Sequence, residues 1–516
     1  MAKLEETSIL DYFSKKPTHG PAVLRPDRPT QARRAATRSE ANSRLPVQQL
    51  PFELLSEVMR LAVEMTIPTP YLWRTLVYVR GLSRVCSRWR DVALRTPQLW
   101  LLEYTEATGY PLSPLTELFL ERSKPLPFRV VLASPERGAY DDDDEDDETW
   151  NPELSDLIAT GFGETIDRWG DLVLQIRDRS EFTDLAELPR NRAASLTKLD
   201  VLVRLLKGNR WQGPPLDMFA TAPRLTEVKL RLHFLDDPVV VMLPLPWAQL
   251  TTLTVQFDTA QSTFDVLACC PALESLAICL PAAPLIGSQK FPDLRLARVK
   301  TLELNITSTS TGGCLHPFLS ALDLPALESF HFDVYPLAFE WFYDGFTTSI
   351  ERFLSRSAAI SSFTFAFLPT PSAQALVQFL RLMPALKRLK LTSILAEEFL
   401  DALQHPPIDG GKTLVPLLED LEITAFGHRY LQLVEWTEAR LLEMLSSRWV
   451  GAGSDTSSSI LRLRRCRFEA DGLKPLSTDF LEKMGKMEEE GFVWNYVVIH
   501  GEDASDWSDS DDDHSE

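Results

Sequence analysis

The chain has 516 residues, 44% of them hydrophobic and 24% charged, so it is long enough for several domains and a sizeable core. The net charge of −20 is unevenly spread, because residues 141–148 and 502–516 contribute eight acidic side chains each, or 16 of the 20 charges. Sequence-independent binding of nucleic acid needs clustered Lys and Arg, so this charge pattern predicts a protein that does not bind nucleic acid.

Cysteine spacing and hydropathy narrow the class of protein further. The six cysteines follow neither a CxxC nor a CxxC–HxxxH spacing, which argues against a zinc module and a disulfide framework and favours a reducing compartment. No stretch of 18 apolar residues occurs, and the first six residues lack the apolar region of a secretory signal. We therefore expect a soluble protein, cytoplasmic and/or nuclear, without a membrane, metal or cofactor partner.

Residues 1–44 are polar, are interrupted by four prolines and hold nine Lys or Arg against five Asp or Glu, which predicts a disordered basic arm. Within it, Ile9 is followed three residues later by Tyr12 and Phe13 and then by two lysines. This order resembles the peptide that docks on the DNA sliding clamp, although Glu6 stands where that peptide has Gln. The resemblance implies clamp docking through Ile9, Tyr12 and Phe13; an amphipathic fragment of a flexible arm is the alternative.

Residues 45–100 have apolar side chains at helical spacing and predict a small all-α module. One helix is expected to carry a wide apolar stripe of Leu54, Leu55, Val58, Met59 and Ala62. A second is expected to carry Leu82, Val85, Cys86, Trp89 and Val92. About 50 residues can hardly bury that much apolar surface alone, so the module is expected to have a partner.

Three separated motifs in this module resemble the F-box family. They are Leu50-Pro51-x-Glu53-Leu54-Leu55, Val85-Cys86-x-x-Trp89-Arg90 and Pro97-x-Leu99-Trp100, in the family's order. A middle segment, residues 64–81, is longer than the family's pattern, and this length and the T-P-x-L-W ending look like F-box proteins abundant in mushroom-forming fungi.

The resemblance implies that the module docks on the Skp-family adaptor of a cullin–RING ubiquitin ligase. The positions that match the docking surface are Leu50, Pro51, Leu54, Leu55, Val58, Val85 and Trp89. For each of these residues, packing in the core of the module is the alternative. Trp100 is expected to seal the join between the module and the rest of the chain, and residues 101–151 are expected to be a linker with an acidic loop.

Residues 152–500 contain a repeat with apolar side chains at positions i, i+3 and i+5, from Trp169/Leu172/Leu174 to Leu463/Cys466/Phe468. We call this pattern the repeat frame. Position i+2 is polar in every copy, which is the alternation of a strand with one buried face. The i+2 residues are Asp171, Lys198, Glu227, Thr252, Ser275, Thr301, Ser329, Ser362, Arg388, Asp420 and Arg465.

A proline stands at i−2 in five copies and closes whatever helix precedes it. Suitable helices are expected at 263–270, 317–322 and 373–382. Units of helix, stop and strand with the frame L-x-x-L-x-L resemble leucine-rich repeats. The expected fold class is therefore α/β: an all-α F-box module followed by an irregular leucine-rich-repeat solenoid, a curved parallel sheet with outer helices. An ordinary α/β domain is the alternative.

In such a sheet, positions i+2 and i+4 share the open face. The target-binding candidates on this concave face are Lys229, Glu303, His331, Arg388, Lys390, Glu422, Arg465 and Arg467. Their mixed charge suits a protein or peptide with its own charge pattern.

These features predict a substrate-recognition subunit of an SCF-type cullin–RING ligase, whose F-box binds the adaptor, and through it the cullin and RING subunits, while the repeats capture a target protein. A non-degradative scaffold is the alternative. Catalytic motifs are missing from the sequence, so no enzyme activity is expected, and the Cys269–Cys270 pair is expected in the core. Residues 501–516 are expected to be a disordered acidic tail, in which Ser508 and Ser510, each with an acid at +3, match the preference of acidophilic kinases.

Overall fold

The protein is described here from a computed structural model. It describes residues 46–66, 72–101, 114–133, 162–176, 183, 185–186, 188–190, 192–204, 214–233, 238–280, 290–306, 312–334, 346–357, 359–367, 373–393, 397–407, 412–426, 437–450, 462–471 and 476–499. The predictions for the arm, including Ile9, Tyr12 and Phe13, for the acidic run 141–148 and for the tail 501–516 lie outside these ranges. None of the helices within them is both long and apolar enough to cross a membrane.

The described residues belong to two compact units. The first comprises Met1–Leu225 with Val241–Pro246, and the second comprises Thr226–Val240 with Trp247–Glu516. The helical module and the first strands belong to the first unit, and most of the repeats belong to the second.

The first unit begins with the helical module predicted for 45–100. Its elements are α3 (Pro46–Gln49), α4 (Phe52–Thr66), α5 (Leu72–Ser83), α6 (Ser87–Arg95) and the 3-10 turn η1 (Pro97–Trp100). Helix α4 packs against α5 and α6, and the core between them includes the buried side chains of Leu55, Met59, Leu76, Val79 and Val92. The all-α prediction for this segment is confirmed.

The second helix of the module differs from the prediction, because the residues expected on one helix lie on two. Helix α5 ends at Ser83 and α6 begins at Ser87. Between them Cys86 has an extended backbone (φ −161°, ψ 174°), and its Sγ accepts a hydrogen bond from the Trp89 backbone N at 3.4 Å. A sulfur acceptor at this position caps the first turn of α6, a role that Ser or Asp fills more often. The apolar spacing continues through residues 84–86, so it does not indicate that the helix ends there.

Trp100 joins the module to the next helix, α7 (Pro114–Arg122). Its side chain is fully buried, its Nε1 donates to the Ala93 carbonyl at 2.8 Å, and its ring meets the Phe119 ring edge-on at 5.3 Å between centroids. Trp100 thus seals the end of the module, and the helix against which it packs lies in the segment expected to be a linker.

The described strands form a parallel sheet, and their order is that of a 13-stranded sheet, β1-β2-β3-β4-β5-β6-β8-β10-β11-β12-β13-β14-β15. In the first unit they are β1 (Phe128–Ala133), β2 (Trp169–Ile176) and β3 (Lys198–Arg204). In the second they are β4 (Glu227–His233), β5 (Thr252–Phe257), β6 (Ser275–Leu280), β8 (Thr301–Ile306), β10 (Ser329–Val334), β11 (Ser362–Phe367), β12 (Arg388–Ser393), β13 (Asp420–Phe426), β14 (Arg465–Asp471) and β15 (Val493–Ile499). The short β7 (Leu294–Arg295) and β9 (Leu322–Asp323) pair separately.

The repeat frame sets the register of this sheet. Ser329 pairs with both Thr301 and Ser362, Arg388 pairs with Asp420, and Asp420 pairs with Arg465, so equivalent frame positions lie side by side. Burial alternates along β5, β6 and β8, where positions i+3 and i+5 are buried whereas i+2 and i+4 are not. The prediction of parallel strands with one buried face is confirmed.

Two strands, β1 and β15, were not predicted. Strand β1 lies within 101–151, where only a linker was expected, and it pairs with β2. Strand β15 pairs with β14. Position i of the repeat frame is Pro127 for β1 and Gly491 for β15, so neither strand begins with the large apolar side chain that the frame requires.

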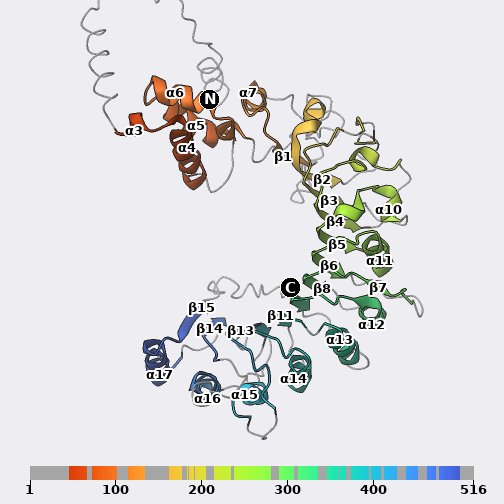
Figure 1. Cartoon of the computed structure of the whole chain (residues 1–516), viewed down its shortest axis with the longest axis vertical. Coiled ribbons are helices and arrows are strands. Elements are labelled where there is room, and N and C mark those ends of the chain that lie inside the picture. The colour runs from red at the N-terminus through yellow and green to blue at the C-terminus, as the bar shows by residue number, and fades with distance from the viewer. Residues whose placement is uncertain are drawn as a thin grey trace, which may run out of the picture. The chain divides into compact units, whose positions relative to one another are not determined.

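The helices of the second unit lie on one side of its strands (Figure 1). They are α11 (Ala260–Ala268), α12 (Gly312–Ala321), α13 (Phe346–Ser355), α14 (Ala373–Arg381), α15 (Glu397–Leu403), α16 (Glu438–Val450) and α17 (Thr478–Glu489). From α12 onward each helix packs against the next. The helices expected at 263–270, 317–322 and 373–382 correspond to α11, α12 and α14. The remaining short elements are α10 (Val239–Met242), η2 (Phe162–Arg168), η3 (Asp217–Phe219) and η4 (Trp247–Gln249).

Two arginines form hydrogen bonds to the C-terminal ends of helices that precede them in the chain. Arg168 donates to the Leu120 carbonyl in the last turn of α7 at 2.7 Å. Arg356 donates to the carbonyls of Leu319 and Ser320 in the last turn of α12 at 2.7 and 2.9 Å. The last carbonyls of a helix lack intrahelical partners, so each guanidinium satisfies acceptors that the helix itself leaves open.

Glycine 170 is required by a close approach of two chain segments. A Cβ added at Gly170 in β2 would lie 2.9 Å from the Cβ of Pro127, whereas one added at Gly485 within α17 would meet nothing within 4 Å. We expect Gly170→Ala to destabilise the protein by about 1–3 kcal/mol through overpacking. Gly485→Ala, the matched control, should stabilise it by about 0.5–1 kcal/mol because Gly is a poor helix former. Urea unfolding of both variants checks the opposite signs.

Candidate functional site

Helix α4 carries two apolar stripes with opposite exposure. Leu55 and Met59 are fully buried against the rest of the module. Leu54, Val58, Leu61 and Met65 follow one another at spacings of four, three and four residues, which places them along one side of the helix. Their side chains are 55%, 47%, 43% and 86% exposed. We call these four residues the outer stripe.

Further exposed apolar side chains lie in the same module. Phe52, Val77, Tyr78 and Val85 are exposed as well. Together with the outer stripe they account for eight of the eleven large apolar side chains that are exposed among the described residues. Scattered exposed apolar residues are normal, whereas a concentration of this kind in one small module is typical of surfaces at which proteins contact one another.

The seven predicted adaptor-binding residues do not share one environment. Pro51, Leu54, Val58 and Val85 are exposed, and Leu50 and Trp89 are half-buried. Leu55 is fully buried, because it faces α5 and α6 rather than solvent, so it is a core residue and cannot contact a partner directly. Phe52, Leu61, Met65, Val77 and Tyr78 belong to the exposed set and were missed. The spacing of the outer stripe could have indicated Leu61 and Met65.

Trp89 of α6 has an unsatisfied polar atom. Its indole Nε1 is buried and has no hydrogen-bond partner among the residues that the structure describes. A buried donor without an acceptor costs free energy, about 1–3 kcal/mol. This cost bears on the stability of the module, because the nitrogen is enclosed within it.

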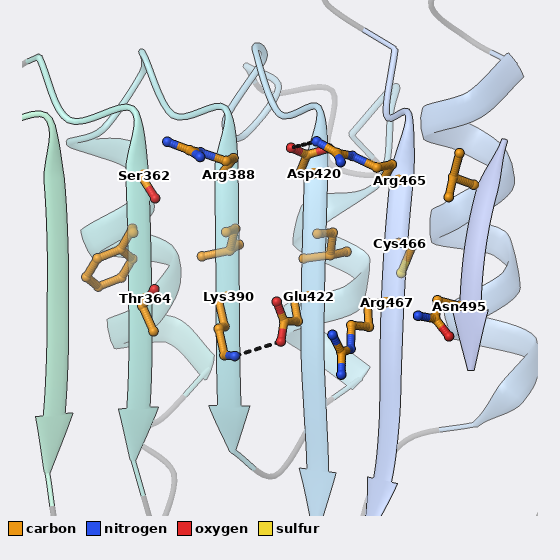
Figure 2. A pocket seen from close by; sticks show the side chains of 14 residues that line it. Ser362, Thr364, Arg388, Lys390, Asp420, Glu422, Arg465, Cys466, Arg467 and Asn495 are labelled. Carbon is orange, nitrogen blue, oxygen red and sulfur yellow. Dashed lines mark hydrogen bonds and ion pairs between the residues drawn. The ribbon is translucent and has the colours of Figure 1, made fainter. Parts of the chain in front are cut away.

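The second candidate surface lies on the open face of the second unit, where five strands from β11 to β15 contribute side chains to one hollow of about 400 Å³ (Figure 2). We call it the charged pocket. It is lined by Ser362, Phe363, Thr364, Arg388, Leu389, Lys390, Asp420, Leu421, Glu422, Arg465, Cys466, Arg467, Val493 and Asn495. The polar members stand at positions i+2 and i+4 of the repeat frame, so the strand register brings them together.

Most charges of the pocket are paired across neighbouring strands. Lys390 Nζ lies 2.7 Å from Glu422 Oε1, and Arg465 binds both carboxylate oxygens of Asp420 at 2.7 and 2.8 Å. The hydrogen bond to Asp420 raises the pKa of Arg465. Arg467 pairs with Glu469, the next open-face residue of its own strand. A bidentate Arg–carboxylate pair fixes geometry more firmly than a single contact.

Arg388 is the exception. It is exposed, and although its backbone N donates to the Ser361 carbonyl at 3.0 Å, its guanidinium has no hydrogen bond or ion pair within the described part of the chain. Figure 2 shows its side chain extending toward Ser362 on β11 and away from Asp420, whose carboxylate is already engaged by Arg465. Its five N–H donors are therefore open to a ligand with an acidic group.

The structure brings together five of the eight predicted target-binding residues. Arg388, Lys390, Glu422, Arg465 and Arg467 all line the charged pocket. Glu303 and His331 pair in register on β8 and β10, and His331 also pairs with Thr364 of the pocket. Lys229 lies on β4, outside the lining of the pocket. Ser362, Asp420 and Asn495 line the pocket and were not among the predicted residues, although the first two stand at i+2.

Two cysteines of the described residues, Cys270 and Cys466, lie in the core. Burial raises the pKa of the Cys270 thiol to about 12 and also raises that of Cys466, so both thiols are protonated at neutral pH. Cys270 is buried, as predicted, whereas Cys269 is half-buried. Within the described ranges no three His, Cys, Asp or Glu side chains come together in a way that could hold a metal ion.

Comparison with protein-family models finds no match, and comparison with curated proteins finds no significant match. The class of the fold therefore rests on the structure, which is α/β with a large parallel sheet and helices.

Proposed function

We propose that this protein is the substrate-recognition subunit of an SCF-type cullin–RING ubiquitin ligase. In this proposal the module at 45–100 is an F-box that binds a Skp-family adaptor, and the helix–strand units form an irregular leucine-rich-repeat solenoid that captures a target protein. The observation that carries the proposal is the outer stripe of α4, which leaves four large apolar side chains in solvent on a module whose motifs resemble those of the F-box family.

The outer stripe supports a partner with an apolar surface rather than a charged one. Leu54, Val58 and Leu61 follow each other along α4, and Val85 is exposed at the break between α5 and α6. Removing such side chains from water contributes about 25 cal/mol per Å² of apolar area.

The two candidate surfaces have different chemistry, which supports two different partners. The outer stripe is apolar, whereas the charged pocket combines four cations with two carboxylates. A receptor of this kind needs no catalytic residue, because it acts by raising the effective concentration of the bound target near a ubiquitin-loaded enzyme. The adaptor side and the target side can then be altered independently.

Affinity purification of the full chain from cells that contain the ligase components tests the proposal. We expect the adaptor and the cullin to co-purify, and a proteasome inhibitor to increase the amount of captured target. Co-purification of the adaptor without the cullin would favour a non-degradative scaffold over a ligase receptor. Recovery of neither component would reject the assignment of the module as an F-box.

A further inference from the structure

The charged pocket has an excess of positive charge, although the chain as a whole is strongly acidic. Its lining contains Arg388, Lys390, Arg465 and Arg467 against Asp420 and Glu422. Arg388 makes no ion pair with any residue that the structure describes, and it reaches toward a neighbouring strand that presents only the hydroxyls of Ser362 and Thr364. A ligand that supplies carboxylates would complete this site.

The chain itself contains such a ligand close by in sequence. Residues 502–516 hold eight Asp or Glu and no Lys or Arg, and they come shortly after β15, the strand that contributes Val493 and Asn495 to the pocket. Connection to a strand that lines the pocket keeps the acidic segment near the site at all times.

The length of the chain permits the contact. Arg388 is level with Val493 in the strand register, so six residues of β15, about 20 Å along the strand, lie between that level and Ile499, and the three strand spacings from β15 to β12 add about 14 Å across the sheet. An extended chain covers about 3.3 Å per residue, so the seven to fourteen residues between Ile499 and the acids at 506–513 reach about 23–46 Å. The direct path back to Arg388 is about 24 Å, which the acids from Asp509 onward can reach.

We propose that the acidic segment 502–516 binds the charged pocket of its own chain, with a carboxylate on Arg388, so that the pocket is a binding site for acidic peptides that this segment occupies in the absence of another ligand. A short tether gives the segment an effective concentration on the order of 1 mM. At that concentration a contact with a Kd of only about 100 µM is ~90% formed. This inference does not depend on the ubiquitin-ligase proposal.

A labelled peptide of residues 500–516 added to the full-length protein tests the inference by fluorescence anisotropy. In a full-length variant whose eight acids at 502–516 are replaced by Asn or Gln, the pocket is free, and the peptide is expected to bind about tenfold more tightly than to the unaltered protein. Raising the salt from about 0.05 to 0.5 M should weaken this binding, because exposed charges are then screened.

Two further substitutions in the neutralised variant locate the site. Arg388→Glu is expected to weaken peptide binding at least tenfold, and Arg388→Gln by a smaller factor in the same direction. Lys229→Glu is the matched control, because Lys229 is an exposed cation on the same face at i+4 but lies outside the pocket lining, and it should leave binding unchanged. Equal affinity of the neutralised and unaltered proteins would overturn the self-occupied pocket, and equal effects of Arg388→Glu and Lys229→Glu would overturn its location. Circular dichroism confirms that each variant is folded.

Discussion

Arg448→Ala is expected to lower the free energy of unfolding by about 3–5 kcal/mol, which is among the largest effects of a single substitution. Arg448 in α16 is 1% exposed, and it donates to the carbonyls of Leu403 at 2.6 Å and Val415 at 3.2 Å, and also to that of Leu414. Truncation would leave these buried acceptors without donors. Urea unfolding followed by circular dichroism and tryptophan fluorescence measures the loss.

Burial lowers the pKa of Arg448 to about 10, so its guanidinium is still charged at neutral pH and serves all three carbonyls. Arg448→Lys keeps the charge but cannot span three acceptors with one ammonium group, so most of the loss should remain. Arg381→Ala, at an exposed position in the last turn of α14, is the matched control and should change stability by less than about 0.5 kcal/mol. A loss below about 1 kcal/mol for Arg448→Ala would show that α15 and the 414–415 segment do not depend on this side chain.

Leu54→Asp combined with Val58→Asp is expected to raise the Kd for a Skp-family adaptor by more than about a hundredfold, which corresponds to about 3 kcal/mol. Both side chains are exposed on the outer stripe, so the substitutions place charges where the partner must exclude water and leave the core of the module intact. Surface plasmon resonance with purified adaptor measures the change.

Leu481→Asp is the matched control for this experiment. Leu481 is an apolar residue of α17 that is 41% exposed, close to the value for Val58, but it belongs to the other unit of the chain. It should leave adaptor binding unchanged. Leu55→Asp is not a suitable test, because Leu55 is buried in the module and its loss would unfold the module whatever surface the adaptor uses. If the double variant retained the unaltered Kd, the outer stripe would not be the docking surface.

The sheet could be predicted from the sequence because its signal repeats. Each copy of the frame is weak alone, but the polar side chain at i+2 marks the open face of every predicted strand, and equivalent positions then pair in register, as Arg388, Asp420 and Arg465 do. One face of each strand is covered by helices and the other faces solvent. Apolar and polar side chains therefore alternate along every strand.

The elements that were missed break this period for physical reasons. Pro127 and Gly491 begin the frames of β1 and β15, at the ends of the strand order, where fewer neighbours impose the pattern. Cys86 caps the N-terminus of α6 and so separates this helix from α5, and the spacing of apolar residues does not indicate a cap.

The candidate site was predictable in composition but not in detail. The frame placed Arg388, Lys390, Arg465 and Arg467 on one face, yet which cations are paired depends on contacts between strands 32 and 45 residues apart. Only the structure shows that Arg465 takes the Asp420 carboxylate and leaves Arg388 open. The same holds for Leu54 and Leu55, adjacent residues whose opposite exposure follows from the packing of α4 on α5 and α6.

Calorimetric titration of the full-length protein with a purified Skp-family adaptor at several temperatures is the most direct test of the proposed function. Burial of the outer stripe predicts one adaptor bound per chain and a binding enthalpy that becomes more negative as the temperature rises, since covering apolar surface lowers the heat capacity. The same titration with Leu54→Asp and Val58→Asp should give no heat of binding. An adaptor that produces no binding signal with the unaltered protein, or that binds the double variant equally well, would contradict the assignment of residues 45–100 as an F-box.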